Sequence, residues 1–138
     1  MAWLPLTGGC ACGAVRFELD APPVSANWCH CTRCQRRTGT PASPQTRIAP
    51  GSLRVVSGET FLREWAPPGG FAKVFCSECG SSLWSRSSDD PEAISVRLGA
   101  FDGDPGIRPG YRQFVAYAAI WDEIPEDGLP RFAERPPG

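Results

Sequence analysis

Seven cysteines in three closely spaced clusters are the residues of this chain that point most directly to chemistry. The clusters are Cys10–Ala–Cys12, Cys29–His–Cys31–Thr–Arg–Cys34 and Cys76–Ser–Glu–Cys79. Such spacings suit metal chelation, because tetrahedral zinc with bonds of ~2.3 Å needs sulfurs roughly 4 Å apart. They do not suit a disulfide framework, since cysteines one residue apart cannot easily bond and seven is an odd number. The count indicates one closed four-thiolate site and one three-thiolate site with an open position.

A glycine follows both short pairs, at Cys12–Gly13 and Cys79–Gly80. This is typical of metal knuckles, in which the residue after the last thiolate takes a positive φ without steric cost. The alternative is that these cysteines are simply buried, small apolar side chains. For the middle cluster, a second structural zinc site or a reactive dithiol is also open.

His30 stands between two cysteines of the middle cluster. In extended backbone its side chain points away from a metal held by its neighbours, which favours a packing or supporting role. Zinc ligation and general-base catalysis are the alternatives. Trp28 and Trp84 flank cysteine clusters and are predicted to belong to the core.

The net charge of −1 conceals an uneven distribution along the chain. Residues 21–58 contain no acid but five arginines, whereas residues 87–138 contain ten acids and five arginines. A positive field lowers the pKa of thiols and attracts anions. Arg33, Arg36 and Arg37 lie beside the middle cluster and are candidates for such a role. Arg47 and Arg54 are better explained as solvated surface residues.

The length of 138 residues fits a single domain over residues 1–138. The longest apolar run, Phe114–Trp121, has eight residues and is far shorter than a membrane span. Residues 1–5 lack the basic start of a signal peptide. We therefore expect a cytoplasmic protein, in which reduced cysteines bind metal or react.

Fifteen glycines and fifteen prolines favour short strands joined by turns over long helices. Alternation of apolar and polar residues predicts six strands. They are residues 14–19, 53–57, 61–65, 72–76, 82–86 and 94–98. The run Phe114–Trp121 is predicted as a seventh strand, Thr40–Pro44 as a turn segment, and Ser57–Gly58 as a tight hairpin turn. The tail from about Pro125 is expected to be partly disordered. The sequence predicts an all-β fold.

About 65 residues separate the CxC pair from the CxxC pair. A zinc shared by the two pairs would tie the first strand to the middle of the chain. In principle, a metal site stabilises a fold most when it closes a loop as long as this one.

The cysteines and their surroundings resemble a known family. Gly9-Cys-x-Cys-Gly-x-Val-x-Phe17, Cys29-His-Cys-x-x-Cys-Gln-Arg-Arg37 and Phe75-Cys-x-x-Cys-Gly-Ser-x-Leu83, with late Gly99 and Trp121, are similar to the glutathione-dependent formaldehyde-activating enzymes, also called the CENP-V/GFA domain. The resemblance runs from Gly8 to about Phe132. It implies an all-β, Mss4-like fold of small antiparallel sheets stapled by zinc.

The resemblance also implies the two zinc sites and the reaction. Cys10, Cys12, Cys76 and Cys79 would hold a structural zinc, and Cys29, Cys31 and Cys34 a labile catalytic zinc. The namesake carbon–sulfur lyase joins formaldehyde to glutathione. Where the family often carries histidine before the last strand, this chain has Arg112-Gln113-Phe114.

From these observations we expect a zinc-dependent enzyme acting on a thiol adduct of glutathione and a small aldehyde. Arg36 and Arg37 are predicted to pair with the glutathione carboxylates. The alternative is a zinc-stapled binding module for protein or nucleic acid. The slight net negative charge and the single lysine, Lys73, weigh against nucleic acid.

Overall fold

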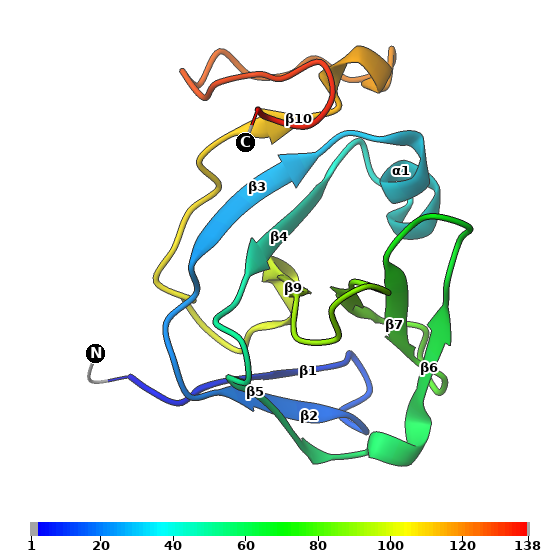
Figure 1. Ribbon diagram of the computed structural model, residues 1–138, viewed down its shortest axis with the longest axis vertical. Coiled ribbons are helices and arrows are strands. Elements are labelled where there is room, and N and C mark those ends of the chain that lie inside the picture. The colour runs from blue at the N-terminus through cyan, green and yellow to red at the C-terminus, as the bar shows by residue number, and fades with distance from the viewer. Residues whose placement is uncertain (1–2, 138) are drawn as a thin grey trace.

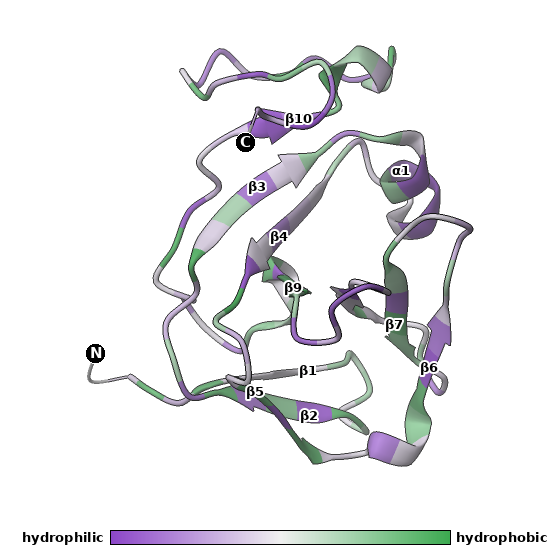
Figure 2. Ribbon diagram, in the orientation of Figure 1, coloured by the Kyte–Doolittle hydropathy of each residue, from purple (hydrophilic) through white to green (hydrophobic). Residues whose placement is uncertain are grey.

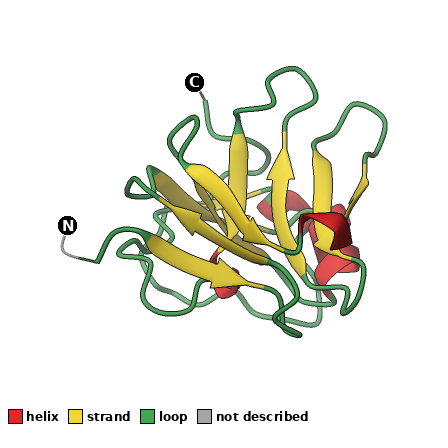
Figure 3. Cartoon of the chain, turned by 90° about the horizontal axis from the view of Figure 1, so that it is seen from below, coloured by secondary structure: helices red, strands yellow, loops and turns green. Residues whose placement is uncertain are grey.

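The computed structural model describes residues 3–137, which form two β-sheets with short helices between the strands (Figures 1 and 3). The strands are β1 (Leu6–Gly9), β2 (Arg16–Leu19), β3 (Ser25–Cys29), β4 (Ser43–Arg47), β5 (Leu53–Ser57), β6 (Leu62–Trp65), β7 (Ala72–Cys76), β8 (Ser82–Arg86), β9 (Ile94–Arg97) and β10 (Arg112–Gln113). The helices are α1 (Thr32–Thr38) and the 3₁₀ turns η1 (Glu59–Phe61), η2 (Leu98–Ala100) and η3 (Val115–Tyr117). The all-β prediction is confirmed.

The smaller sheet has the order β1-β2-β5, and the larger has the order β10-β3-β4-β9-β8-β7-β6. Neighbouring strands are antiparallel except β10 and β3, which run parallel. Figure 1 shows the smaller sheet at the bottom of the molecule and β3, β4 and α1 above it. Among the described residues, no helix has the length and apolar composition needed to cross a bilayer.

The core lies where the smaller sheet packs on β7, β8 and β9. Phe17 of β2 is almost fully buried, and its ring packs edge-on against Trp84 and Phe101, with centroids 5.7 and 5.8 Å away. Burying such a ring stabilises the fold by about 1.5–3 kcal/mol. Figure 2 shows mostly apolar residues along β7 and mostly hydrophilic residues on α1 and on β10, the strand at the far edge of the larger sheet. Trp84 belongs to this core, as predicted, whereas Trp28 is only half-buried.

Two sequence predictions about strands and turns are wrong. Residues 114–121 do not form a strand: Phe114 takes a left-handed conformation (φ 57°) and the chain turns into η3. The amide of Val115 bonds the Phe132 carbonyl rather than a neighbouring strand, so apolar composition alone was misleading. Ser57–Gly58 is not a hairpin turn, because β5 and β6 belong to different sheets.

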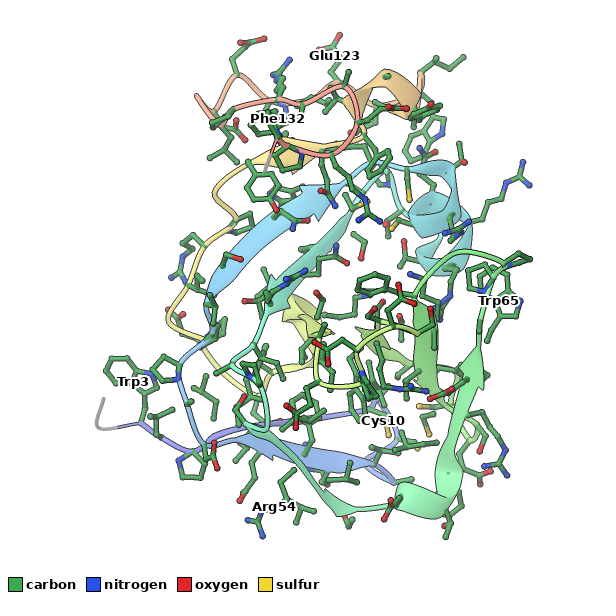
Figure 4. All side chains as sticks on the ribbon, in the orientation of Figure 1. Trp3, Cys10, Arg54, Trp65, Glu123 and Phe132 are labelled. Atoms are coloured by element: carbon green, nitrogen blue, oxygen red, sulfur yellow. The ribbon has the colours of Figure 1, made fainter. Side chains whose placement is uncertain are left out.

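The C-terminal segment lies along β10. Residues 130–132 run beside β10, where the Arg112 amide donates to the Pro130 carbonyl and the Phe132 amide donates to the Arg112 carbonyl, both at 2.9 Å. Figure 1 shows this segment across the top of the molecule, and Figure 4 places Phe132 there. The segment covers an edge of the larger sheet that would otherwise expose unpaired backbone groups.

Candidate metal centres and the adjoining cavity

The first cysteine group joins the end of β1 to the end of β7. Cys10 and Cys12 follow β1, Cys76 closes β7, and Cys79 lies in the next turn. Their four sulfurs lie within 4.8 Å of one another, with Sγ–Sγ distances of 3.6 Å for Cys10–Cys12 and 4.0 Å for Cys12–Cys76. Tetrahedral zinc requires about 3.8 Å. The donor set therefore fits a four-thiolate zinc site, here called the four-cysteine centre.

Local backbone geometry aims these sulfurs at one point. Gly13 and Gly80 have φ values of 79° and 77°, as the glycine positions predict. The Val15 amide donates to Cys10 Sγ at 3.2 Å, and the Glu78 amide donates to Cys76 Sγ at 3.4 Å. Such N–H···S bonds favour the thiolate form that a metal requires.

Ser81 supports the ionised form of the exposed ligand Cys79. Hydrogen bonding by the Ser81 hydroxyl, 3.1 Å from Cys79 Sγ, and by its amide lowers the pKa of Cys79 to about 5. Neutral pH therefore favours a thiolate at this position, ready for a metal.

The second group, here called the three-cysteine centre, lies where β3 leads into α1. Cys29 ends β3, Cys31 is the N-cap of α1 and Cys34 lies in its first turn. All three sulfurs lie within 4.8 Å of one another, and within residues 3–137 no further histidine, cysteine or carboxylate joins them. The donor set fits a metal with one position left for another donor. Figure 4 shows sulfur atoms gathered in two separate places, one beside Cys10 and one beside α1.

One thiolate is favoured within this group. Hydrogen bonding with Cys29 and then with Cys34 lowers the pKa of Cys31, while hydrogen bonding with Cys29 and then with Cys31 raises the pKa of Cys34. The Cys34 amide also donates to Cys31 Sγ at 3.3 Å, because Cys31 caps the helix. The cluster therefore concentrates negative charge on Cys31.

His30 lies on the opposite side of β3 from this centre. Its side chain is buried, and Nε2 is 3.2 Å from a terminal nitrogen of Arg112. A guanidinium can only donate, so the imidazole accepts and is neutral. Burial, together with the Arg112 charge, lowers the pKa of His30. This environment is that of a buried supporting residue.

A cavity of about 620 Å³ adjoins the three-cysteine centre and is here called the thiolate cavity. Its walls include Cys29, Cys31 and Cys34, together with four cations and no carboxylate. The cations are Arg33, Arg47, Lys73 and Arg135. Burial, followed by the nearby Arg97 charge, lowers the pKa of Lys73. An excess of positive charge beside three thiolates favours an anionic ligand.

Arg36 and Arg37 lie on α1 as the sequence requires, but neither lines the thiolate cavity. Arg36 is exposed, and Arg37 is half-buried with its pKa lowered by burial. The sequence did not single out Lys73 or Arg135 for this site, because β7 and the C-terminal segment bring them from more than 35 residues away. The one feature of the sequence that could have indicated a role for Lys73 is that it is the only charged residue in an otherwise apolar strand.

Comparisons with known proteins place this architecture in context. Residues 5–117 match the family model of the glutathione-dependent formaldehyde-activating enzyme. A protein of Halomonas elongata, provisionally named as such an enzyme, is 30% identical over 107 residues, which span 72% of this chain and 67% of that protein.

The solved structures give the same fold. A crystal structure of a Rhodobacter sphaeroides protein is similar with a TM-score of 0.57 and 24% identity, covering 92% of this chain and 99% of the other. The family model covers all seven cysteines and both centres. This chain therefore belongs to the family of glutathione-dependent formaldehyde-activating enzymes.

Proposed function

We propose that this protein is a carbon–sulfur lyase that makes and breaks the adduct between the thiol of glutathione and formaldehyde or another small aldehyde. The observation that carries this proposal is the three-cysteine centre, with room for one more donor, at the wall of a cationic cavity without acids. We place the reaction in the cytoplasm, where cysteines stay reduced. The family name of its relatives supports the choice of glutathione.

Zinc is the cofactor that best suits both donor sets. Cys10, Cys12, Cys76 and Cys79 would hold a structural zinc, and Cys29, Cys31 and Cys34 a second, catalytic zinc. When bound at the three-cysteine centre, zinc would lower the pKa of a thiol that takes the open position. We expect the second ion to be the more labile, because three protein ligands hold it instead of four.

The cations of the thiolate cavity would bind and orient glutathione. Glutathione carries two carboxylates, and Arg33, Arg47, Lys73 and Arg135 are available for them. Arg36 and Arg37, the sequence candidates, would instead contribute to the field around α1. Holding the thiol beside the aldehyde converts a bimolecular encounter into an oriented reaction.

The reaction forms one carbon–sulfur bond and moves one proton. The thiol releases its proton to water, its sulfur attacks the carbonyl carbon, the π electrons pass to oxygen, and that oxygen takes a proton. We assign the donation of this proton to Tyr111, which lines the thiolate cavity and regains a proton from water. The Asn27 side-chain amide donates to Tyr111 Oη at 3.1 Å, which leaves the phenolic proton free to be donated.

A binding titration on protein of known zinc content tests the proposal. Glutathione should bind in the micromolar-to-millimolar range, and Cys31→Ser should weaken it. S-methylglutathione should bind at least tenfold more weakly, because it has no ionisable thiol. Equal binding of the S-methyl form would show that the thiol does not reach the cysteines, and the proposed mechanism would be wrong.

Turnover is measured separately, as the exchange rate between free formaldehyde and S-hydroxymethylglutathione by NMR. The protein should accelerate the exchange, and Tyr111→Phe should slow it without changing glutathione affinity. Binding without acceleration, together with salt-dependent binding of nucleic acid, would support the alternative of a zinc-stapled binding module.

A further inference from the structure

The side chains of Asn27, Gln45 and Arg97 form a row across the larger sheet. Asn27 of β3 lies opposite Gln45 of β4, which in turn lies opposite Arg97 of β9. Directly opposed residues of antiparallel strands point to the same face of a sheet. Asn27 and Gln45 line the thiolate cavity, so the whole row lies on the face that borders this cavity.

The row forms one chain of hydrogen bonds that ends at Tyr111. Arg97 Nη1 donates to the Gln45 side-chain oxygen at 2.6 Å. The Gln45 NH₂ group donates to Asn27 Oδ1 at 3.4 Å, and the Asn27 NH₂ group donates to Tyr111 Oη at 3.1 Å. Each amide thus accepts on the side of Arg97 and donates on the side of Tyr111.

The direction of this chain is fixed at Arg97. A side-chain amide carries both an acceptor and two donors, so an isolated pair of Gln45 and Asn27 could bond in either direction. A guanidinium can only donate, so the Gln45 oxygen must face Arg97 and the Gln45 NH₂ group must face Asn27. Asn27 then accepts from Gln45 and donates to Tyr111. The Tyr111 oxygen becomes an acceptor, and its own proton is not used within the chain.

The surroundings of Arg97 do not account for it as a stabilising ion pair. It is 7% exposed, and within residues 3–137 it forms no ion pair with a carboxylate. Its other terminal nitrogen donates to the neutral Ser85 Oγ at 2.8 Å. Burial is the main cause that lowers the pKa of Arg97. A cation buried among neutral partners costs stability, and a role that depends on its one-way donation explains why it is there.

Packing holds Tyr111 at the end of the chain. Its ring packs edge-on against Phe132, with centroids 5.8 Å apart, and its carbonyl accepts from the Trp28 amide at 3.0 Å. Tyr111 is half-buried and lines the same cavity as the three-cysteine centre. Because the Tyr111 oxygen already accepts from Asn27, its O–H bond is free to turn toward the cavity.

We propose that Arg97, acting through Gln45 and Asn27, is a positioning residue that keeps the Tyr111 hydroxyl an acceptor on the protein side and directs its proton into the thiolate cavity. Arg97 fills this role without touching the reacting atoms. The catalytic consequence rests on the function proposed above, whereas the direction of the chain does not.

Gln45→Glu tests the direction with almost no change in shape. A carboxylate only accepts, so it still bonds Arg97 but makes Asn27 turn its NH₂ group toward position 45. Tyr111 should then donate to Asn27 Oδ1. Raman spectroscopy reports the change, because the intensity ratio of the tyrosine Fermi doublet is high for an accepting hydroxyl and low for a donating one. Every sample also carries Tyr117→Phe, which leaves Tyr111 as the one tyrosine.

The ratio should be high in the zinc-loaded parent protein and low with Gln45→Glu. Ser25→Asp is the matched control: it adds the same charge to the wall of the same cavity, also on β3, and should keep the ratio high. If Gln45→Glu does not fold, Asn27→Asp should lower the ratio in its place, because its carboxylate accepts from Tyr111. A low ratio in the parent protein, no change with either chain variant, or an equal change with Ser25→Asp would overturn the proposal.

Turnover gives a second measurement, by the NMR exchange assay. At saturating glutathione, Gln45→Glu should slow the exchange at least tenfold, while changing glutathione affinity no more than Ser25→Asp does. In a Tyr111→Phe background it should slow the exchange no further, because both changes act on one proton. Additive losses would contradict a positioning role. If Tyr111→Phe alone has no effect on exchange, the catalytic assignment of Tyr111 fails, and the Raman ratio still decides the direction of the chain.

Discussion

Single residues set the geometry of both cysteine groups. Gly80 follows the last cysteine of the four-cysteine centre with a φ of 77°, and a Cβ there would meet no atom within 4 Å. Substitution therefore costs only the strain of the left-handed conformation. The knuckle depends on backbone freedom and not on space.

We predict that Gly80→Ala lowers stability by about 1–2 kcal/mol through this strain alone. Gly99→Ala is the matched control, since Gly99 also has open space but no positive φ, and it should change stability by less than ~0.5 kcal/mol. Urea unfolding of zinc-loaded protein measures both. Equal effects would show that φ at residue 80 does not matter.

Lys73 is the one lysine of the chain, and it is buried in the wall of the thiolate cavity. We predict that Lys73→Gln weakens glutathione binding about tenfold, because a charged hydrogen bond to a carboxylate is lost. Arg63→Gln removes one charge from the exposed face of neighbouring β6 and should have no effect. Calorimetric titration with glutathione, with the zinc content held constant, measures the affinity of both variants. An equal loss of affinity in both would indicate that only the net charge of the protein matters.

At the scale of elements, the C-terminal segment is attached to β10 partly through the Asp127–Arg112 pair. Arg112, followed by the Leu129 amide, lowers the pKa of Asp127 below its usual value of about 3.9. A depressed carboxyl pKa contributes stability above the unfolded-state value and loses it as the pH falls through the folded-state value. We predict that the segment detaches below about pH 4.

Hydrogen exchange at the Phe132 amide, which bonds the Arg112 carbonyl, reports this detachment. Protection should fall as the pH drops below about 4, and Asp127→Asn should lower protection already at neutral pH. Asp104→Asn disrupts an exposed pair with Arg108 and is the control. If Asp127→Asn keeps full protection, the backbone bonds alone hold the segment.

The elements differ in how far the sequence could specify them. β5, β7 and β8 have the predicted bounds, because alternation and flanking turns mark both ends. β3 was missed because the residues on one side of this strand are polar where they line the thiolate cavity, and not because they face solvent. β4 was missed because Pro44 argues against an inner strand; it is tolerated because β9 pairs only from Gln45 onward. Helix α1, with seven residues, is too short for a periodic signal.

The same limit applies to the candidate site. Short spacings marked the two cysteine pairs and the three-cysteine cluster in the sequence itself, and both groups of the structure match the predicted division. The cations of the thiolate cavity come from α1, β4, β7 and the C-terminal segment. Their meeting depends on strand order in the larger sheet, which no local pattern contains.

At the scale of the whole molecule, the four-cysteine centre ties segments 64 residues apart, whereas the three-cysteine centre is local. We propose that residues 1–138 form one domain that unfolds cooperatively. We predict that Cys76→Ser lowers the melting temperature far more than Cys34→Ser, because only the first opens the long-range clip. Circular dichroism melts measure this, and equal losses would contradict the two roles.

Metal content follows the same division. We predict two zinc ions per chain after loading, of which a chelator removes the one at the three-cysteine centre first. Elemental analysis before and after chelation measures the two populations, with Cys31→Ser as the variant that should retain only the resistant ion. Two ions of equal resistance would overturn the distinction between the centres.

The order of the cysteines along the chain also has a consequence for biosynthesis. The three-cysteine centre is complete once Cys34 leaves the ribosome, whereas the four-cysteine centre must wait for Cys79, 45 residues later. At about 5–20 residues per second, that interval lasts roughly 2–9 s. A nascent chain thus presents its local thiol cluster to the metal pool before the long-range one exists.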